Sequence, residues 1–386
     1  MKRTLFVVSV LAVLALAYVH WILPGKVEAS MNTVLPHQPY RVSEQARRLH
    51  ESAFVIDLHS DSLLWKRNIV KESDVGHVDV PRLKRGNVGL QVFSAVTKSP
   101  EGLNYSRNTD GSDDITKLAL VQMWPPRTWS SLYERAAYQL EKLYAFASAS
   151  DLVVIRNRQE FEALIKRRES GMPDIGAVYL IEGAHPLEGE LQNLDRLYEQ
   201  GLRIVGLTHF FDNELGGSLH GVSGDGLSDF GKAVILRANE LSMIVDVAHA
   251  SPAMVSDVLD ISDSPLMLSH GGIRGSCDSE RNLSDALMRR FASQGGLIGI
   301  GYWHAAVCDA SPQGIVRAIR YAIDLLGVEH VALGSDYDGT VEVPFDTSEL
   351  QILTEVMLQQ GFSEDEIRKV LGDNARQFLL ENFPLN

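Results

Sequence analysis

Histidine, aspartate and glutamate residues follow six short apolar segments of this 386-residue chain. Their ring nitrogen and carboxylate oxygen atoms are the usual protein ligands of zinc and related metal ions. One such residue at the end of a segment usually packs or caps a helix, but six independent coincidences are improbable. The residues are Asp57, His59, Asp61, Glu182, His209, Asp246, His249, His270, Asp336 and Asp338. Their pattern predicts a metal centre.

Five of these side chains offer more ligands than one metal ion needs. His59 and Asp61 are two residues apart on an extended segment, so both can project to the same side and chelate one ion. A catalytic zinc takes three protein ligands and a water molecule. Three histidines and two carboxylates exceed this need and would suit two ions bridged by a carboxylate. Such a centre would be slightly positive and could supply hydroxide as a nucleophile at neutral pH.

The apolar segments themselves are predicted to be parallel strands. Continuous apolar runs are typical of strands buried on both faces. Helical periodicity lies between them, as in residues 131–149, where Ala136, Leu140 and Leu143 are spaced by four and three residues. This alternation predicts an α/β fold, a (β/α)8 TIM-type barrel of the metal-dependent hydrolase kind, with a doubly wound open sheet as the alternative. The eight predicted strands are 53–58, 89–96, 177–181, 204–207, 244–247, 266–268, 297–301 and 331–333.

The composition and the absence of certain motifs exclude several classes of protein. The 45% hydrophobic content excludes disorder as the main state, and the formal net charge of -14 argues against a nucleic-acid partner. The sequence has neither the Gly-x-Ser-x-Gly motif of serine hydrolases nor a phosphate-binding loop with its lysine. No linker divides the body, so residues 48–386 are expected to form a single catalytic barrel.

The first 29 residues differ from this acidic body and are predicted to direct export. Lys2 and Arg3 precede an apolar run over residues 5–23, as in a signal peptide. The small residues at 27 and 29 suit a signal peptidase, but the run is also long enough to span a bilayer as a retained anchor. Both alternatives place the protein in the periplasm or anchored in the inner membrane facing it. Residues 30–47 are the expected linker.

The chain has two cysteines, Cys277 and Cys308, and both follow predicted strands on the same face of the barrel. In an exported protein they can form a disulfide. Two free buried cysteines are an equally good interpretation, so the sequence leaves their state open.

Seven ordered motifs give residues 48–382 a resemblance to a known family. At these positions the sequence resembles the membrane (renal) dipeptidase family of zinc peptidases, and its bacterial members in particular. The motifs lie at 55–61, 181–185, 206–210, 245–249, 268–270, 281–282 and 334–339. The resemblance implies the same barrel fold and a metallo-dipeptidase activity.

The resemblance also implies which residues bind the metal ions. His59, Asp61 and Glu182 would hold one zinc. Glu182 would bridge to a second zinc, whose other ligands would be His249 and His270. The implied cofactor is therefore two zinc ions per chain.

Three further residues would bind the substrate if the resemblance holds. His209 would bind the substrate carbonyl and stabilise the tetrahedral oxyanion. Arg281 would grip the C-terminal carboxylate of a dipeptide with its two-pronged guanidinium group. Asp336 would contact the free amino group and pass a proton to the leaving amine. His209 and Asp336 are thus the expected catalytic residues.

The function that follows is hydrolysis of dipeptides by a hydroxide that bridges two zinc ions. The resemblance implies tolerance for a D-residue at the C-terminal position, and a homodimer. One alternative is another di-metal amide, lactone or ester hydrolase on the same barrel. A second is a binding protein that keeps the metal site without turnover, which the presence of both Asp336 and Arg281 disfavours.

Other conspicuous residues near the motifs have two interpretations each. Asp57 and Asp246 either orient neighbouring metal ligands or cap and pack. Trp65 and Tyr337 either line the pocket or only cover it. His185, beside the expected bridging glutamate, is predicted to support the ligands or the fold rather than to bind metal.

Overall fold

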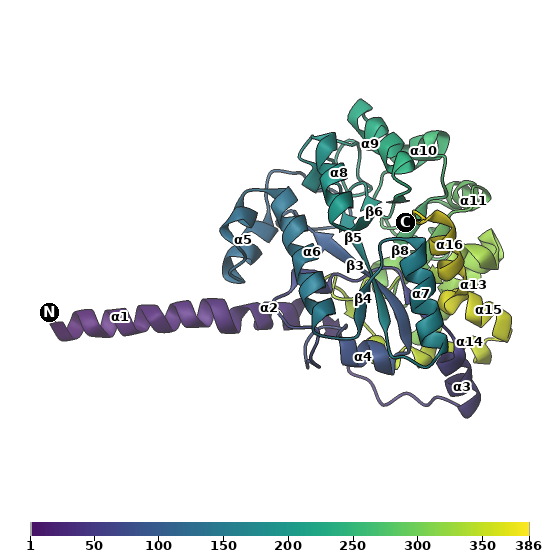
Figure 1. Ribbon diagram of the computed structural model, residues 1–386, viewed down its shortest axis with the longest axis horizontal. Helices are drawn as coiled ribbons and strands as arrows, with labels where there is room; N and C mark the ends of the chain where they lie inside the picture. Colours follow the sequence, from purple (N-terminus) through teal and green to yellow (C-terminus); the bar gives the residue numbers. More distant parts are fainter. Residues whose placement is uncertain (1, 386) are drawn as a thin grey trace.

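Eight short parallel strands close into a barrel in the computed structural model, which describes residues 2–385 (Figure 1). β3 pairs with both β2 and β5, so the sheet closes on itself. The predicted (β/α)8 barrel is therefore confirmed, and the open doubly wound sheet is excluded. The barrel strands are β2 (Val55–Asp57), β3 (Val88–Val96), β5 (Ile175–Glu182), β6 (Leu202–Gly206), β7 (Ile244–Asp246), β8 (Met267–Gly271), β9 (Leu297–Ile300) and β10 (Val331–Leu333).

Each barrel strand overlaps one of the predicted apolar segments. The sequence did not predict three short strands outside the barrel: β1 (Thr33–Val34), β4 (Leu152–Val154) and β11 (Glu342–Val343). β4 extends the sheet beside β5, and β1 pairs with β11. β1 and β11 have only two residues each, which are too few to show a period. β4 is only partly buried, so it differs from the barrel strands, which are buried on both faces.

Alternation along the strands separates the barrel interior from its outer face. Val178 and Leu180 belong to an apolar cluster that takes residues from all eight barrel strands and from two helices, α7 and α16. The intervening Tyr179 points outward and donates a hydrogen bond of 2.6 Å to the carbonyl of Ala136. Because side chains alternate along a strand, Glu182 lies on the same inward face as Leu180. It therefore projects into the barrel above an apolar floor.

Helices surround the barrel, and most begin after a serine, aspartate or asparagine whose side chain accepts a hydrogen bond from the first turn. In α6, for example, Ser131 accepts from the amide of Glu134, and the predicted stripe of Ala136, Leu140 and Leu143 is buried. The helices of the barrel region are α3 (Glu44–Ser52), α4 (Val80–Arg85), α5 (Asp114–Val121), α6 (Leu132–Ser148), α7 (Arg158–Glu169), α8 (Leu191–Gln200), α9 (Asp229–Glu240), α10 (Pro252–Ile261), α11 (Asp285–Ser293), α12 (His304–Val307), α13 (Pro312–Leu326), α14 (Gln351–Gln359), α15 (Glu364–Arg368) and α16 (Asn374–Asn382).

The long connection between β3 and β5 carries additional elements. It spans about 80 residues and contains α5, α6, β4 and α7. Its first part crosses the barrel mouth, where the amide of Asn108 donates a 2.8 Å hydrogen bond to the carbonyl of His220. This connection therefore covers the face on which the predicted site residues lie.

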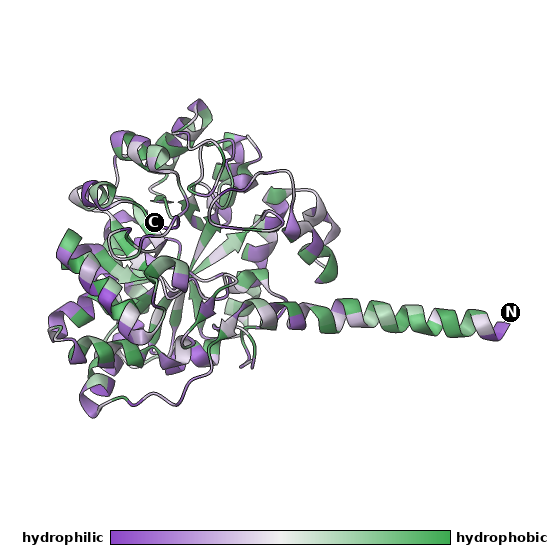
Figure 2. Ribbon diagram, turned by 180° about the vertical axis from the view of Figure 1, so that it is seen from behind, coloured by the Kyte–Doolittle hydropathy of each residue, from purple (hydrophilic) through white to green (hydrophobic). Residues whose placement is uncertain are grey.

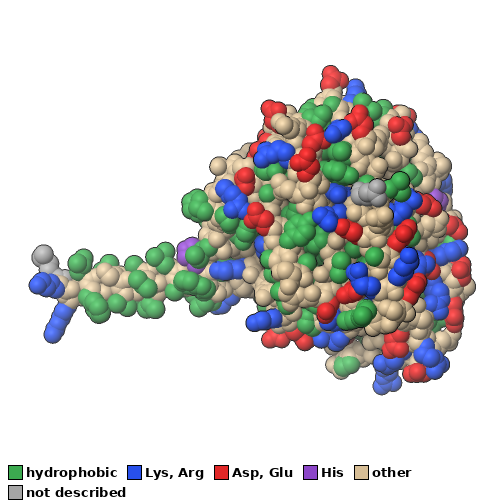
Figure 3. Space-filling view, in the orientation of Figure 1, with side chains coloured by type: hydrophobic (Ala, Val, Ile, Leu, Met, Phe, Trp, Pro, Cys, Tyr) green, Lys and Arg blue, Asp and Glu red, His purple; other side chains and the backbone are tan. Residues whose placement is uncertain are grey.

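An N-terminal helix projects from the barrel (Figure 1). It comprises α1 (Lys2–Ala17), a π-helical turn (Tyr18–Ile22) and α2 (Leu23–Met31). No residue of α1 is buried, and the helix is long and apolar enough to cross a membrane. Figure 2 shows that most residues of this helix are hydrophobic, and Figure 3 shows basic side chains near its free end. The helix is compatible with the predicted signal peptide or anchor.

The structure pairs Cys277 with Cys308 in a disulfide. The bond joins the segment after β8 to the end of α12, and α12 follows β9. The Cα atoms of the two cysteines are 5.4 Å apart. It thus ties together two of the segments that leave the barrel mouth.

Removing this disulfide should destabilise the protein. For a sequence separation of 31 residues, loop-closure entropy predicts a loss of about 3 to 4 kcal/mol in the free energy of unfolding. Urea denaturation of the double variant Cys277→Ser/Cys308→Ser should therefore show a lower midpoint than the wild type. Dithiothreitol should lower the midpoint of the wild type but not that of the variant. Equal midpoints for oxidised wild type and variant would show that the bond contributes nothing.

Candidate metal centre

The carboxylate of Glu182 lies at the centre of the barrel mouth, surrounded by four histidines from other strand ends. Its Oε1 atom is 3.0 Å from Nε2 of His249, 3.4 Å from Nε2 of His270 and 3.5 Å from Nε2 of His59. Its Oε2 atom is 3.5 Å from Nε2 of His209. Histidines that are 150 residues apart in sequence therefore aim the same ring nitrogen at one carboxylate.

Two aspartates complete the cluster beside His59. Nε2 of this histidine is 3.5 Å from Oδ1 of Asp61 and 3.9 Å from Oδ1 of Asp336. All seven side chains are buried. Three overlapping groups have ligand atoms within 4.8 Å of one another: His59, His270 and Asp336; Glu182, His209 and His249; and His59, Asp61 and Glu182. The structure thus brings together every metal ligand that the sequence predicted.

Several of these atoms lack hydrogen bonds within residues 2–385. They include Nε2 of His59, Oδ1 of Asp61 and Oε2 of Glu182. A buried polar atom without a partner costs about 1 to 3 kcal/mol, and more if it is charged. Imidazole nitrogens and carboxylate oxygens facing one point are also the donor set that zinc prefers. The residues present therefore fit a metal site.

The electrostatics of the cluster lead to the same conclusion. Burial raises the pKa of Glu182 well above its usual value and that of Asp336 to about 8. Burial alone would lower the pKa of His59, but the carboxylates of Glu182 and Asp61 outweigh it and raise this pKa to about 10. The cluster thus retains protons to offset its crowded carboxylates. Divalent cations can replace those protons, because metal binding releases protons from its ligands.

Ser269 orients two of the histidines. Its hydroxyl donates a 2.6 Å hydrogen bond to Oδ2 of Asp246 and lies 2.9 Å from Nδ1 of His270 and 3.3 Å from Nδ1 of His59. Since the hydroxyl donates its proton in the hydrogen bond to the aspartate, its oxygen can accept a hydrogen bond from an imidazole Nδ1–H. This arrangement leaves the Nε2 lone pair free to face Glu182. Asp246 therefore acts on the ligands through Ser269, which the sequence analysis did not single out.

Asp57 fixes the neighbouring strand ends in a similar way. Its Oδ1 atom accepts a 2.9 Å hydrogen bond from the amide of Ser335, and its Oδ2 atom accepts one of 2.5 Å from the Ser335 hydroxyl. The same hydroxyl lies 3.1 Å from the carbonyl of His59. Asp57 thus locks the end of β2 to the end of β10, directly before Asp336.

The guanidinium of Arg281 is buried next to the cluster. It donates hydrogen bonds of 2.6 Å to the carbonyl of Ala248 and 2.7 Å to the carbonyl of His270. Its plane packs over Trp303, 5.6 Å from the ring centroid. No carboxylate within residues 2–385 forms an ion pair with it. Each terminal nitrogen keeps one hydrogen for another acceptor.

Three residues that the sequence analysis missed help to enclose the site. Nε1 of Trp303 donates a 2.9 Å hydrogen bond to the hydroxyl of Tyr105, whose carbonyl lies 2.8 Å from Nδ1 of His220. The ring of His220 stacks on Phe210, next to His209. Tyr105 belongs to the long connection after β3, and the length of this connection was the one available signal.

The remaining conspicuous residues now have definite places. Trp65 lines the pocket described below, and its Nε1 donates a 2.7 Å hydrogen bond to the carbonyl of Asp338. Tyr337 is fully buried and donates to the carbonyl of Phe345. His185 lies outside the metal-ligand groups and stacks on Phe211 with ring centroids 4.5 Å apart.

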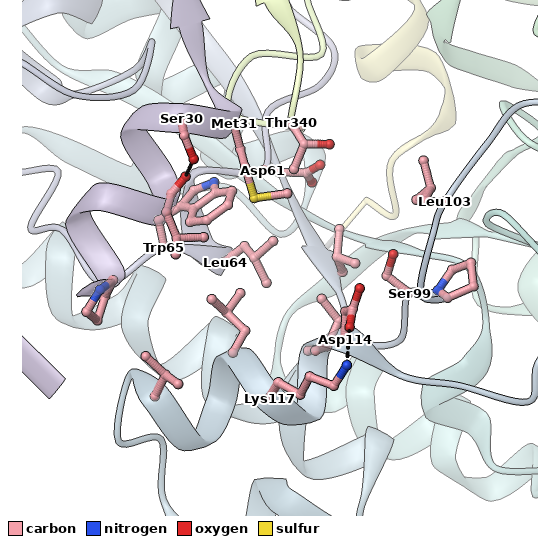
Figure 4. A pocket seen from close by; sticks show the side chains of 18 of the residues that line it. Ser30, Met31, Asp61, Leu64, Trp65, Ser99, Leu103, Asp114, Lys117 and Thr340 are labelled. Atoms are coloured by element: carbon pink, nitrogen blue, oxygen red, sulfur yellow. Dashed lines mark hydrogen bonds and ion pairs between the residues drawn. The ribbon is translucent and has the colours of Figure 1, made fainter. Parts of the chain in front are cut away.

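A cavity of about 640 Å³ leads from the cluster to the protein surface. Asp61 and His209 line its inner end, and apolar side chains such as Leu64 and Trp65 line much of the rest (Figure 4). A small ligand can therefore reach the candidate metal centre through a mostly apolar passage.

Comparisons with known proteins agree with this site. The model of the family "Membrane dipeptidase (Peptidase family M19)" matches residues 43–381. An uncharacterised dipeptidase from Schizosaccharomyces pombe is 27% identical, covering 97% of this chain and 89% of that protein. Dipeptidase 3 from Mus musculus is also 27% identical, covering 86% of this chain and 65% of that protein.

A solved structure shares the fold. It is a metallopeptidase from Rhodobacter sphaeroides liganded with a phosphinate mimic of the dipeptide L-Ala-D-Ala. The two structures align with a TM-score of 0.70 and 23% sequence identity, over 86% of this chain and 99% of the other.

Replacing the central carboxylate should disrupt the metal site. In Glu182→Gln, an amide that binds metal weakly replaces a carboxylate that belongs to two of the three candidate ligand groups, so metal per chain should fall by at least half. Hydrolytic activity should fall by at least about 100-fold, as expected when a shared metal ligand is lost. Elemental analysis and an activity assay check this, with Glu199→Gln on exposed α8 as the control. Unchanged metal content would refute the central role of Glu182.

Removing the hydroxyl that orients two ligands should weaken metal binding without abolishing it. In Ser269→Ala, Nδ1 of His270 loses its partner, so metal affinity should fall by about 10- to 100-fold. Titration with a competing chelator measures this change, and Ser293→Ala on the exposed end of α11 is the matched control. Equal resistance to chelation would mean that Ser269 does not orient the ligands.

Proposed function

Because the chain belongs to the membrane dipeptidase family, peptidase family M19, we propose that it is a zinc-dependent dipeptidase whose substrates include dipeptides with a C-terminal D-residue. Membership of the family makes it a metallo-dipeptidase, a hydrolase of peptide bonds. The observation that carries the finer proposal is the buried carboxylate of Glu182, which belongs to two candidate ligand groups and lies beside facing atoms without hydrogen-bond partners, such as Nε2 of His59.

We assign two zinc ions to the cluster. His59, Asp61 and Glu182 would hold one, and Glu182, His249 and His270 would hold the other. When bound, the two ions activate water as a nucleophile at neutral pH and polarise the substrate carbonyl. The donor set and the unpartnered atoms support this assignment.

Arg281 binds the C-terminal carboxylate of the substrate. A buried cation without a counter-ion is costly, and Arg281 is 2% exposed without an ion pair in residues 2–385. A substrate carboxylate supplies the missing charge and accepts the two remaining terminal hydrogens in a bidentate pair. The carbonyls of Ala248 and His270 hold the guanidinium in place before the substrate arrives.

His209 and Asp336 act on the reacting bond. Burial lowers the pKa of His209 to about 4, so its imidazole is neutral at pH 7 and can donate a hydrogen bond to the carbonyl oxygen as it becomes an oxyanion. Asp336 accepts a hydrogen bond from the substrate amino group. With a pKa raised by burial to about 8, it can take up a proton and deliver it to the leaving amine.

The substrate range and location of the protein follow from the same features. The Rhodobacter sphaeroides structure holds a mimic of L-Ala-D-Ala, which supports dipeptides with a C-terminal D-residue as substrates. The basic residues Lys2 and Arg3 before the apolar helix favour a cytoplasmic N-terminus, with the barrel on the periplasmic side. We also propose that the enzyme forms homodimers, as the family resemblance implies.

Blocking the substrate amino group tests the proposed function. N-acetylation removes the charge-assisted contact with Asp336, so kcat/KM for an acetylated dipeptide should be about 10- to 100-fold lower than for the free dipeptide. A chelator should abolish both activities. In Asp336→Asn the difference in kcat/KM between the free and the acetylated dipeptide should largely disappear, because the enzyme no longer offers a carboxylate to the amino group of either substrate.

Two results would contradict the proposal. Equal cleavage of free and N-acetylated dipeptides by the wild type would favour a general amide hydrolase on the same barrel. A content of fewer than about two zinc ions per active chain would contradict the proposed binuclear site.

A further inference from the structure

The projecting helix changes character after Ile22. Side chains before this point are almost all exposed, whereas Pro24, Glu28 and the following Asn32 are buried against the barrel. Nδ1 of His20 already lies 3.0 Å from the carbonyl of Val121 in the barrel domain. At 1.5 Å per residue, the part before it, residues 2–19, is about 27 Å long. This length is close to the thickness of the hydrocarbon core of a bilayer, about 30 Å. The remaining segment, residues 23–34, belongs to the folded body.

An ion-pair chain connects this segment to the barrel mouth. Nε of Arg67 donates a 2.5 Å hydrogen bond to Oε1 of the buried Glu28. The same guanidinium pairs with Asp338. Asp338 in turn accepts hydrogen bonds of 2.5 Å from the Ser62 hydroxyl and 2.6 Å from the amide of His77. It lies two residues after Asp336, so the helix end and the candidate catalytic residue share one network.

Main-chain bonds continue the attachment after the helix. β1 pairs with β11, and the amide of Leu35 donates a 2.8 Å hydrogen bond to the carbonyl of Val343. The amide of Thr340 donates a 2.8 Å hydrogen bond to Oδ1 of Asn32. Residues 32–35 are thus paired with the segment that follows Asp336.

One face of this segment forms a wall of the cavity that leads to the metal centre. Leu23, Val27 and Met31 are spaced four residues apart, on one side of a helix, and all three line the cavity. Figure 4 shows Met31 beside Trp65 and Asp61. The cavity is therefore enclosed on one side by the end of the projecting helix.

Cleavage after Ala29 would destroy this wall. It would remove Leu23, Val27 and Glu28, and the nearly buried Arg67 would lose one of its two carboxylate partners. Residues 27 and 29 have the small side chains that a signal peptidase prefers, but the same stretch of chain is part of the folded domain. Cleavage there would therefore disrupt the fold.

We propose that the helix is retained as a membrane anchor and that residues 23–34 form a subsite for a large apolar side chain of the substrate. This inference rests on the proposed dipeptidase function. Neither Asp336 nor Arg281 lines the cavity itself, but Gly339 and Thr340, which closely follow Asp336 in the chain, do. None of the residues that Arg281 contacts lines it: Ala248, His270 and Trp303. The cavity therefore lies on the side of the site that binds the substrate amino group. The subsite therefore receives the side chain of the N-terminal residue. The preferred substrates are dipeptides that begin with a large apolar residue.

Substrate selectivity of the full-length, detergent-solubilised enzyme tests the subsite. The wild type should prefer Phe-Ala to Gly-Ala. In the double variant Val27→Ala/Met31→Ala, the ratio of kcat/KM for Phe-Ala to that for Gly-Ala should fall by about five-fold, since apolar contact area with the phenyl ring is lost. Leu16→Ala, exposed on the same helix, should leave the ratio unchanged.

The outcomes separate this inference from the function on which it rests. If the wild type hydrolyses both dipeptides and the double variant keeps the same ratio, the subsite is refuted and the dipeptidase function stands. If the wild type hydrolyses no dipeptide, the proposed function fails and the subsite fails with it.

The intact mass of the protein extracted from cell membranes provides a readout independent of activity. A mass that includes residues 2–29 supports retention of the anchor. A mature chain that begins at Ser30 would overturn the inference, because the wall would then be absent from the working enzyme.

Discussion

The structure depends on the cost of burying the Glu182 carboxylate in the barrel mouth. Three carboxylates and four imidazoles meet there with few hydrogen bonds between them. Such a group of charges is stable only with compensating protons or cations. Every element around the mouth serves to hold these side chains at one point in spite of their repulsion. The pairs Asp57–Ser335 and Asp246–Ser269 do so by tying neighbouring strand ends together.

The apolar barrel interior makes this arrangement possible. Val178 and Leu180 fill the barrel below Glu182, so water cannot approach the carboxylate from beneath. Low local dielectric strengthens every interaction above that floor. The net charge of -14 consequently describes the outer surface, while the mouth presents metal ligands and the buried cation Arg281. An anionic carboxylate can therefore bind at the mouth of an acidic protein.

The sequence predicted the features that depend on neighbouring residues in the chain, but not those that depend on contacts between distant segments. The barrel strands are continuous apolar runs, a local signal, and their ends carry His59, Glu182 and His270 in order. The places of Tyr105, Trp303 and Ser269 depend on contacts between segments far apart in sequence, which no local pattern records. The pairing of Cys277 with Cys308 stayed open for the same reason, because only the fold brings their Cα atoms to 5.4 Å.

The segment after β10 shows how one short stretch of chain couples distant parts of the molecule. Asp336 faces the metal ligands, Asp338 pairs with Arg67, and Thr340 bonds to Asn32 beside the projecting helix. Asp336 and Asp338 both adopt positive φ angles, near +60°, which non-glycine residues tolerate only where surrounding contacts hold them. The contacts that hold Asp338 include the pair between Glu28 and Arg67. A change at the helix end can therefore reach Asp336 through this strained segment of backbone, in addition to the cavity wall that the helix shares with Asp61.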